Sequence, residues 1–348
     1  MDYAVNIARM FYGLPRTEFR QLAHHYALAC KCSSIPNGWH TEQAASRDWY
    51  YGFMERHPNL SLKTPEGMSI ARAIGFNKRA VDLFFGLYGS IMEQYHFQPD
   101  RIFNIDESAL STVMKPCKVV CERGAPVASQ ISQEKGVTMT FVGIISAAGT
   151  TLPPVFILPR KRWCDSFMRN TIHGSKGIVT PANNRWMDKD AFVETLKHIK
   201  DKTFCTVDNK ILVIMDNAGV HKSCSAIDYC RANGIVILTL PPHTTDKMQP
   251  LDVSVYGPFK ASLRTVQTSF HHMHPHQSIT AQLLPEMASK AWIKAANTSN
   301  ILSGFQASGI WPIDPDIFPE SAFVGSIVSD QPQPGKHIES LFDSFLFT

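Results

Sequence analysis

The stretch Lys210–Asp216 reads Lys-Ile-Leu-Val-Ile-Met-Asp, and the earlier stretch Arg101–Asp106 reads Arg-Ile-Phe-Asn-Ile-Asp. Each is a short apolar run that ends on an aspartate, a pattern typical of a buried strand followed by a loop or helix. A third run, Ile235–Leu240, is ended by Pro241-Pro242. These runs predict the central strands of a buried sheet.

The surrounding region, residues 98–312, alternates short β-rich runs with longer amphipathic ones. Val137–Ser146 and Thr151–Leu158 predict a hairpin pair, and Asp188–Lys202 predicts an amphipathic helix. Ser223–Asn233 predicts a short helix closed by a glycine in the C-cap role. Strands first, then strand–helix alternation, indicate an α/β fold with a mixed sheet flanked by helices.

The two ends of the chain differ from this region. Residues 1–97 read as helical, with apolar residues at helical spacing from Phe19 to Ala27, a helix predicted over Thr41–Arg56 and another over Asn77–Tyr95. Residues 313–348 are rich in Pro, Asp and Ser and predict a flexible C-terminal tail.

Composition and charge exclude some classes of protein. The apolar stretch Phe141–Pro159 is broken by glycines and prolines, so it predicts strands and no membrane partner. The N-terminus lacks a signal-peptide core, so we expect an intracellular protein. Of the 348 residues, the first 80 hold ten Lys/Arg against six Asp/Glu, while the rest hold 24 of each sign. That excess fits a nucleic-acid-binding module, although a chance fluctuation is an equally good explanation.

Three acids stand out because each is expected where the chain changes from buried strand to loop or helix: Asp106, Asp216 and Asp252. One such aspartate is most often a helix cap or a turn former. Three together, each with distinctive neighbours, favour a common role. Cleavage of a phosphodiester needs an activated oxygen and a stabilised leaving oxygen, and two Mg²⁺ ions about 4 Å apart, held by carboxylates, supply both.

Other candidates carry weaker signals. Glu107 would point to the opposite face of its strand from Asp106, which favours a structural role. His221 and His243 could orient a phosphate, but turn residues are the more common reading. The cluster of Arg160, Lys161 and Arg162 precedes a tryptophan and could contact a DNA backbone; a plain surface loop is equally consistent.

At these residues the sequence resembles the pogo, Tigger and jerky group of DDE-superfamily transposases and their domesticated relatives. The segments that carry the resemblance are Phe-Asn-Ile-Asp-Glu-Ser at 103–108, Val-Ile-Met-Asp-Asn-Ala-Gly at 213–219, Gln-Pro-Leu-Asp at 249–252 and the closing block at 304–312. Asp252 lies 36 residues after Asp216, a short interval of the kind found in that family.

The resemblance implies an RNase H-like fold with Asp106, Asp216 and Asp252 as catalytic and metal-binding residues. It also implies Mg²⁺ or Mn²⁺ as a pair of ions, DNA as the partner, a nuclear location and self-association as a homodimer. The expected organisation is a centromere protein B-type helix-turn-helix region over 1–75, a linker helix over 76–97, an endonuclease domain over 98–312 and the tail.

Residues 45–62 are similar to the second helix-turn-helix of centromere protein B-type regions. This similarity implies that Arg47, Arg56, His57 and Lys63 face DNA; the alternative is a helical bundle with solvated charges. Because such proteins usually carry an earlier helix-turn-helix, the chain is expected to be truncated in or after that module.

The leading hypothesis is therefore a metal-dependent DNA endonuclease and strand transferase. The alternative is a domesticated, catalytically inactive, sequence-specific DNA-binding protein. A third hypothesis, an unrelated α/β hydrolase, is disfavoured because the sequence has neither a Gly-x-Ser-x-Gly elbow nor a Walker loop.

Overall fold

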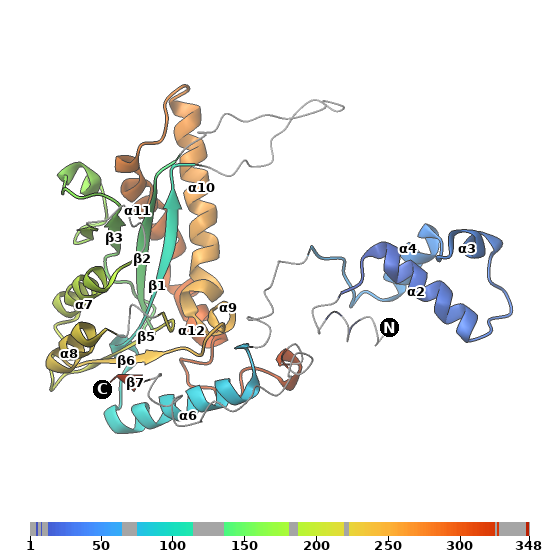
Figure 1. Cartoon of the computed structure of the whole chain (residues 1–348), viewed down its shortest axis with the longest axis horizontal. Helices are drawn as coiled ribbons and strands as arrows, with labels where there is room; N and C mark the ends of the chain where they lie inside the picture. Colours follow the sequence, from blue (N-terminus) through green and yellow to red (C-terminus); the bar gives the residue numbers. More distant parts are fainter. Residues whose placement is uncertain are drawn as a thin grey trace. The chain divides into compact units, whose positions relative to one another are not determined.

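The computed structural model describes residues 5, 8, 13–64, 75–113, 136–180, 187–218, 223–323, 326 and 346–347 (Figure 1). The chain divides into two compact units. The first comprises Met1–Lys78 with Phe318–Gln333, and the second comprises Arg79–Ile317 with Pro334–Thr348.

The first unit contains α2 (Arg16–Ala29), α3 (Asn37–Glu42) and α4 (Arg47–Arg56), which share an aromatic core. Phe53 of α4 lies 5.2 Å from the ring of Phe19 in α2 and 5.2 Å from Trp49. Such ring contacts bury a large apolar area for few residues, which is how a small helical module gains stability. In the same unit, the rings of Phe318 and Phe323 pack against Phe76, so this part of the predicted tail is anchored.

The predicted helix over Thr41–Arg56 is wrong, because the structure breaks it into two. Gln43 adopts the left-handed conformation, with φ of 50°, and ends α3. Ser46 then caps α4 by accepting a hydrogen bond from the backbone N–H of Trp49 at 3.1 Å. Between them, the buried Ala45 donates its N–H to the carbonyl of Arg20 in α2, a tertiary contact that helical periodicity does not reveal.

The second unit is built on one mixed sheet. Its strands are β1 (Ile102–Ser111), β2 (Thr138–Ser146), β3 (Val155–Leu158), β4 (Lys176–Val179), β5 (Ile211–Met215), β6 (Ile235–Thr239) and β7 (Leu346–Phe347). They lie in the order β4-β3-β2-β1-β5-β6-β7. β1, β2 and β3 form an antiparallel meander, and β5 and β6 continue the sheet parallel to β1. This is the RNase H-like arrangement that the family resemblance implies.

Two strand boundaries differ from the prediction. β1 continues to Ser111, well beyond Asp106, because β2 pairs with it along its whole length. β3 begins only at Val155, because Pro153 and Pro154 precede it and proline has no N–H to donate to a ladder.

The helices around this sheet are α6 (Lys78–Tyr95), α7 (Lys189–Thr203), α8 (Cys224–Asn233), α9 (Thr245–Met248), α10 (Tyr256–Met273), α11 (Leu284–Ala295) and α12 (Thr298–Ala307). Figure 1 shows α7 and α8 on one side of the sheet and α10 and α11 on the other. On the first side, Phe192 of α7 joins Ile105 and Val213 in one buried cluster. On the second, Phe141 of β2 stacks on Phe259 of α10 at 4.8 Å.

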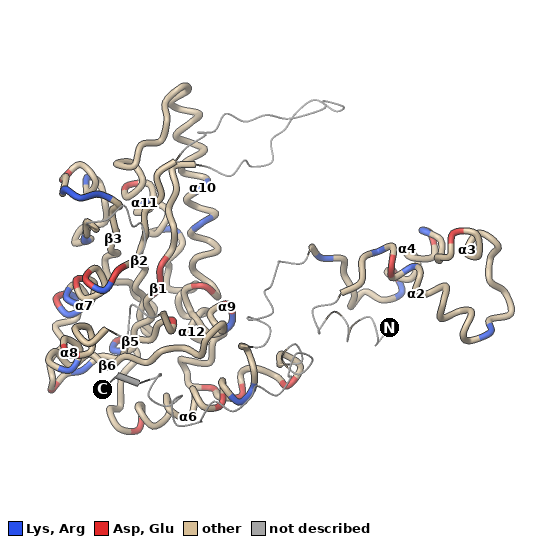
Figure 2. Tube along the Cα trace, viewed as in Figure 1, with Lys and Arg blue, Asp and Glu red and all other residues tan. Residues whose placement is uncertain are grey.

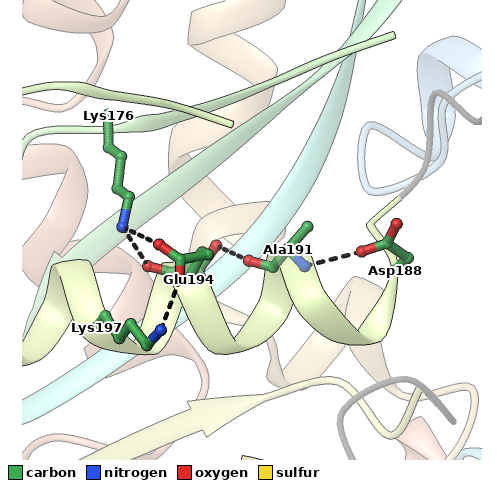
Figure 3. Close-up of polar contacts among 6 residues, drawn as sticks. Lys176, Asp188, Ala191, Glu194 and Lys197 are labelled. Carbon is green, nitrogen blue, oxygen red and sulfur yellow. Dashed lines mark hydrogen bonds and ion pairs between the residues drawn. The ribbon is translucent and has the colours of Figure 1, made fainter. Parts of the chain in front are cut away.

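Polar contacts at α7 hold the edge strand β4 (Figure 3). Asp188 caps α7 by accepting the N–H of Ala191 at 2.8 Å, as its place before a helical run suggests. Glu194 accepts from Lys176 of β4 at 2.8 Å and from Lys197 at 2.7 Å. None of the helices in the described part of the chain combines the length and apolar character needed to cross a membrane.

Candidate active site

Asp106 and Asp216 lie at the same level of adjacent parallel strands. In the pairing of β1 with β5, Asn104 is opposite Ile214, and each aspartate is two residues further along its strand. Asp216 follows the last residue of β5, and its Oδ1 accepts the N–H of Ala218 at 3.4 Å. Asp106 lies within β1, just past the part that pairs with β5, and both aspartates are half-buried.

Asp252 belongs to a π-helical turn, Leu251–Val255, that leads directly into α10. The residues just before this turn are held against β1. Gln249 is fully buried and donates its amide N–H to the carbonyl of Ile105 at 2.9 Å. The backbone N–H of Leu251 donates to Oδ1 of Asn104 at 3.1 Å. These bonds bring an acid from a distant part of the chain to the other two.

The electrostatics of Asp106 show that the three acids share one neighbourhood. Burial raises the pKa of the Asp106 carboxyl well above its ordinary value, and the charges of Asp252 and Asp216 raise it further. A hydrogen bond from the backbone N–H of Glu107 acts in the opposite direction on the same pKa. A partly desolvated carboxylate that faces two like charges is unfavourable unless a proton or a cation neutralises it.

Tyr256 and Gly143 hold the backbone of Asp106 in place. The Tyr256 hydroxyl donates to the backbone carbonyl of Asp106 and accepts the N–H of Gly143 at 3.2 Å. Burial raises the pKa of Tyr256 well above its ordinary value, so this hydroxyl keeps the proton that it donates. Gly143 is the cross-strand partner of Asp106, and an added Cβ there would lie 2.8 Å from Trp292. Only glycine leaves room for this packing.

The donor set is suited to a hard divalent cation. All three candidates offer carboxylate oxygens, which Mg²⁺ and Mn²⁺ prefer. Across the described ranges, no three His, Cys, Asp or Glu side chains are gathered closely enough to hold one ion among them. Mg²⁺ usually keeps several waters and takes one or two protein carboxylates, with the remaining ligands from substrate phosphate.

The predicted DNA-facing residues of the first unit are arranged around α4. Arg47 and Arg56, at its two ends, are exposed, and Lys63 is exposed beyond it. Figure 2 marks the Lys and Arg positions along the trace in blue. The two arginines are nine residues apart, about two and a half helical turns, so they lie on opposite sides of the helix. His57 is half-buried, with its ring 4.3 Å from that of Phe53, and it contributes to packing.

The basic cluster of the second unit lies in the loop after β3. Lys161 and Arg162 are exposed, whereas the Arg160 guanidinium lies 4.9 Å from the centre of the Phe167 ring. Trp163 covers Gly177 of β4, where an added Cβ would lie 2.6 Å from the indole. The loop is thus anchored by its tryptophan, with two of its three cations facing solvent.

Sequence reasoning did not select Asn104, Gln249 or Tyr256 as site residues. The available signal was an asparagine inside an otherwise apolar strand, which needs buried hydrogen-bond partners. Glu107 is half-buried, and because side chains alternate along a strand it lies on the opposite face of β1 from Asp106. His243 is exposed, and His221 lies outside the described residues.

The chain is similar to one curated protein in sequence and to solved structures in its backbone. A curated relative, the MFS-type transporter clz9 of Cochliobolus lunatus, is 29% identical over 197 residues, which are 56% of this chain and 21% of that protein. The chain thus spans about a fifth of that relative's length. Among solved structures, the Mos1 mariner paired end complex with Mn aligns over 90% of this chain and 81% of its own, with 12% identity and a TM-score of 0.49. The Mos1 catalytic domain aligns over 76% and 98%, with 10% identity and a TM-score of 0.40.

The family comparison bears on the site itself. Residues 135–305 match the family model described as DDE superfamily endonuclease. That range contains Asp216 and Asp252, while Asp106 precedes it on the strand that pairs with β2. Residues 135–305 of this chain are therefore similar to a DDE superfamily endonuclease domain.

Proposed function

We propose that this protein is a metal-dependent DNA endonuclease and strand transferase that uses Asp106, Asp216 and Asp252. The observation that carries the proposal is their convergence: two acids at one level of adjacent parallel strands, and a third whose charge acts on Asp106. The endonuclease family match over residues 135–305 supports the same chemistry.

In this proposal Asp106 and Asp252 hold one divalent ion, and Asp216 shares or holds the other. When bound, the two ions would activate the attacking oxygen and stabilise the leaving one. Tyr256 fixes the backbone of Asp106, so the carboxylate does not move as charge builds up beside it. Water adds its oxygen to the phosphorus, and the 3′ oxygen leaves and takes a proton. The freed 3′-hydroxyl then gives up its proton and bonds to a phosphorus of the target DNA, and the 3′ oxygen of the target strand leaves and takes a proton.

The proposed partner is DNA, bound in two places. A helix that lies in a groove contacts both walls, which suits Arg47 and Arg56 on opposite sides of α4, with Lys63 and His57 beyond the helix. Lys161 and Arg162, beside Arg160, would contact backbone phosphates in the second unit. A nuclear location and action as a homodimer belong to the same proposal.

The first test is nicking of a supercoiled plasmid in Mg²⁺ or Mn²⁺. Wild-type protein is expected to nick, EDTA to stop the reaction, and Asp216→Ala to abolish it. The matched control is Asp228→Asn, an exposed aspartate on α8, which should cut like wild type. Equal, metal-independent nicking by wild type and Asp216→Ala would contradict the proposal. DNA binding that weakens with salt, without cleavage, would instead support the inactive DNA-binding alternative.

A second test measures the site without DNA. Asp106→Asn removes a charge that is desolvated and repelled by Asp252 and Asp216, so it should raise the Tm of the metal-free protein. Mn²⁺ should raise the Tm of wild type and leave that of Asp106→Asn unchanged, because a ligand that binds only the folded state stabilises it. A metal-free Tm below wild type for Asp106→Asn would count against the convergence of these charges.

A further inference from the structure

A single buried asparagine connects the three segments that carry the acids. Nδ2 of Asn104 donates to the carbonyl of Ile214 and to Oε1 of Gln249, both at 3.0 Å. Its Oδ1 accepts the N–H of Leu251 at 3.1 Å. Gln249 in turn donates to the carbonyl of Ile105 at 2.9 Å. We call Asn104 and Gln249, both fully buried, the amide pair.

Each of these bonds lies close in sequence to one of the acids. Asn104 is two residues before Asp106, and its partner Ile214 is two residues before Asp216. Gln249 is three residues before Asp252. The amide pair thus ties the start of the π-helical turn to β1 and β5, two strands that the sheet already joins to each other.

The chemistry of the pair makes it selective for one arrangement. Asn104 uses both amide hydrogens and its oxygen at once, so a shift of the turn along β1 would leave buried polar groups without partners. An apolar pair of the same size would pack as well but would tolerate sliding, because dispersion contacts have no direction. A carboxylate at residue 104 would face two acceptor oxygens and repel both.

We infer that the amide pair is a positioning device for cleavage: it sets where Asp252 stands relative to Asp106 and Asp216. Asn104 and Gln249 touch neither substrate nor cation in this role; they act through the turn and the strands that they join. The inference rests on the proposed function and adds to it residues that decide how well the acids are aligned. When a residue that hydrogen-bonds to a metal-ligand segment is lost, metal affinity or activity typically falls by about 10- to 100-fold.

The test compares two identical substitutions on the same scaffold. Gln249→Met keeps the length of the side chain and removes its hydrogen bonds. Gln267→Met is the matched control: Gln267 of α10 is also buried and donates at 2.9 Å to a β1 carbonyl, that of Ser111, away from the acids. Gln267→Met loses one amide bond to β1 and Gln249→Met loses two, so the stability of both variants is measured beside their function.

Three readouts separate positioning from folding. Urea denaturation shows whether each variant is folded. Mn²⁺ binding, measured by paramagnetic resonance of the free ion, and plasmid nicking at saturating Mn²⁺ should fall about 10- to 100-fold in Gln249→Met. Both should match wild type in Gln267→Met. Hydrogen exchange of the metal-free protein should accelerate over 249–255 in Gln249→Met alone.

Wild-type Mn²⁺ affinity and nicking in Gln249→Met, or an equal fall in Gln267→Met, would overturn the inference. If Gln249→Met does not fold, Asn104→Ser, which keeps a small hydrogen-bonding group at residue 104, is measured in its place with the same expected results. A wild type that neither binds Mn²⁺ nor cuts DNA would refute the proposed function. In that case hydrogen exchange of Gln249→Met tests the positioning role. Unchanged exchange over 249–255 would refute that role, and localised acceleration would support it.

Discussion

The replacement of Gly143 by alanine tests how tightly the support behind Asp106 is packed. A Cβ at this position would lie 2.8 Å from Cη2 of Trp292, 3.0 Å from the Tyr256 hydroxyl and 3.3 Å from Cδ2 of Leu251. Carbon atoms pack best at about 3.5–4.0 Å, so at least two of these neighbours must move.

Those neighbours have little room to retreat. Trp292 and Tyr256 are each 1% exposed, and the Trp292 ring is already in contact with Phe141 at 5.0 Å and Phe259 at 5.6 Å. Inserting a methyl group into such a core typically costs about 1–3 kcal/mol. With a urea m-value of about 2–3 kcal/mol/M, a loss of about 2 kcal/mol lowers the unfolding midpoint by about 0.7–1 M.

Urea denaturation followed by circular dichroism measures this shift. Gly86→Ala is the control, because Gly86 lies in α6 with open space around it; there alanine should stabilise by about 0.5–1 kcal/mol through its helix propensity. A midpoint for Gly143→Ala at or above that of wild type would refute the packing argument. So would an equal fall in Gly86→Ala.

Three further predictions concern single polar contacts. Tyr256→Phe removes a buried hydroxyl with two hydrogen bonds and should cost about 1–3 kcal/mol by urea denaturation, together with a fall in nicking; an unchanged midpoint would contradict it. His198 is held neutral, because burial lowers its pKa while its ring N–H donates to the Pro153 carbonyl. Its contribution to stability is therefore present above the unfolded pKa of about 6.5 and is lost as pH falls, so Tm should drop more between pH 7 and 5 in wild type than in His198→Gln; parallel curves would exclude this. Hydrogen bonds from Lys176 and Lys197 lower the pKa of Glu194, which adds stability above the unfolded pKa of about 4.3 that is lost as pH falls. Because this carboxylate is 41% exposed, Glu194→Gln should cost under about 1 kcal/mol at pH 7, and the cost should shrink in high salt; a cost that salt does not change would argue against an ion pair.

Much of the sheet could be predicted because its signals are local. The runs that become β5 and β6 are entirely buried, and a continuous apolar run bounded by turn residues predicts such a strand directly. The helix α8 could be predicted equally well, because Ser223 caps its start and Gly234, at φ of 70°, ends it. The order of these elements was enough to predict a mixed sheet covered by helices.

Other features had no local signal. The short edge strand β4 became a strand because β3 lies beside it and Trp163 covers its glycine. The break between α3 and α4 depends on Ala45 being held by α2. In both cases a contact with a distant segment outweighs the preference of the residues themselves.

The candidate site also combines residues that the sequence indicates with residues that only the folded structure reveals. Its three aspartates were recognisable in the chain, because two of them end apolar runs and all three lie in blocks that resemble a known family. The amide pair could not be recognised in this way, because Asn104 and Gln249 are 145 residues apart and neither local sequence indicates contact with the other. A side chain's type and its immediate neighbours are properties of the chain, whereas its hydrogen-bond partner is chosen by the folded sheet. Only folding could therefore decide how the acids are held together.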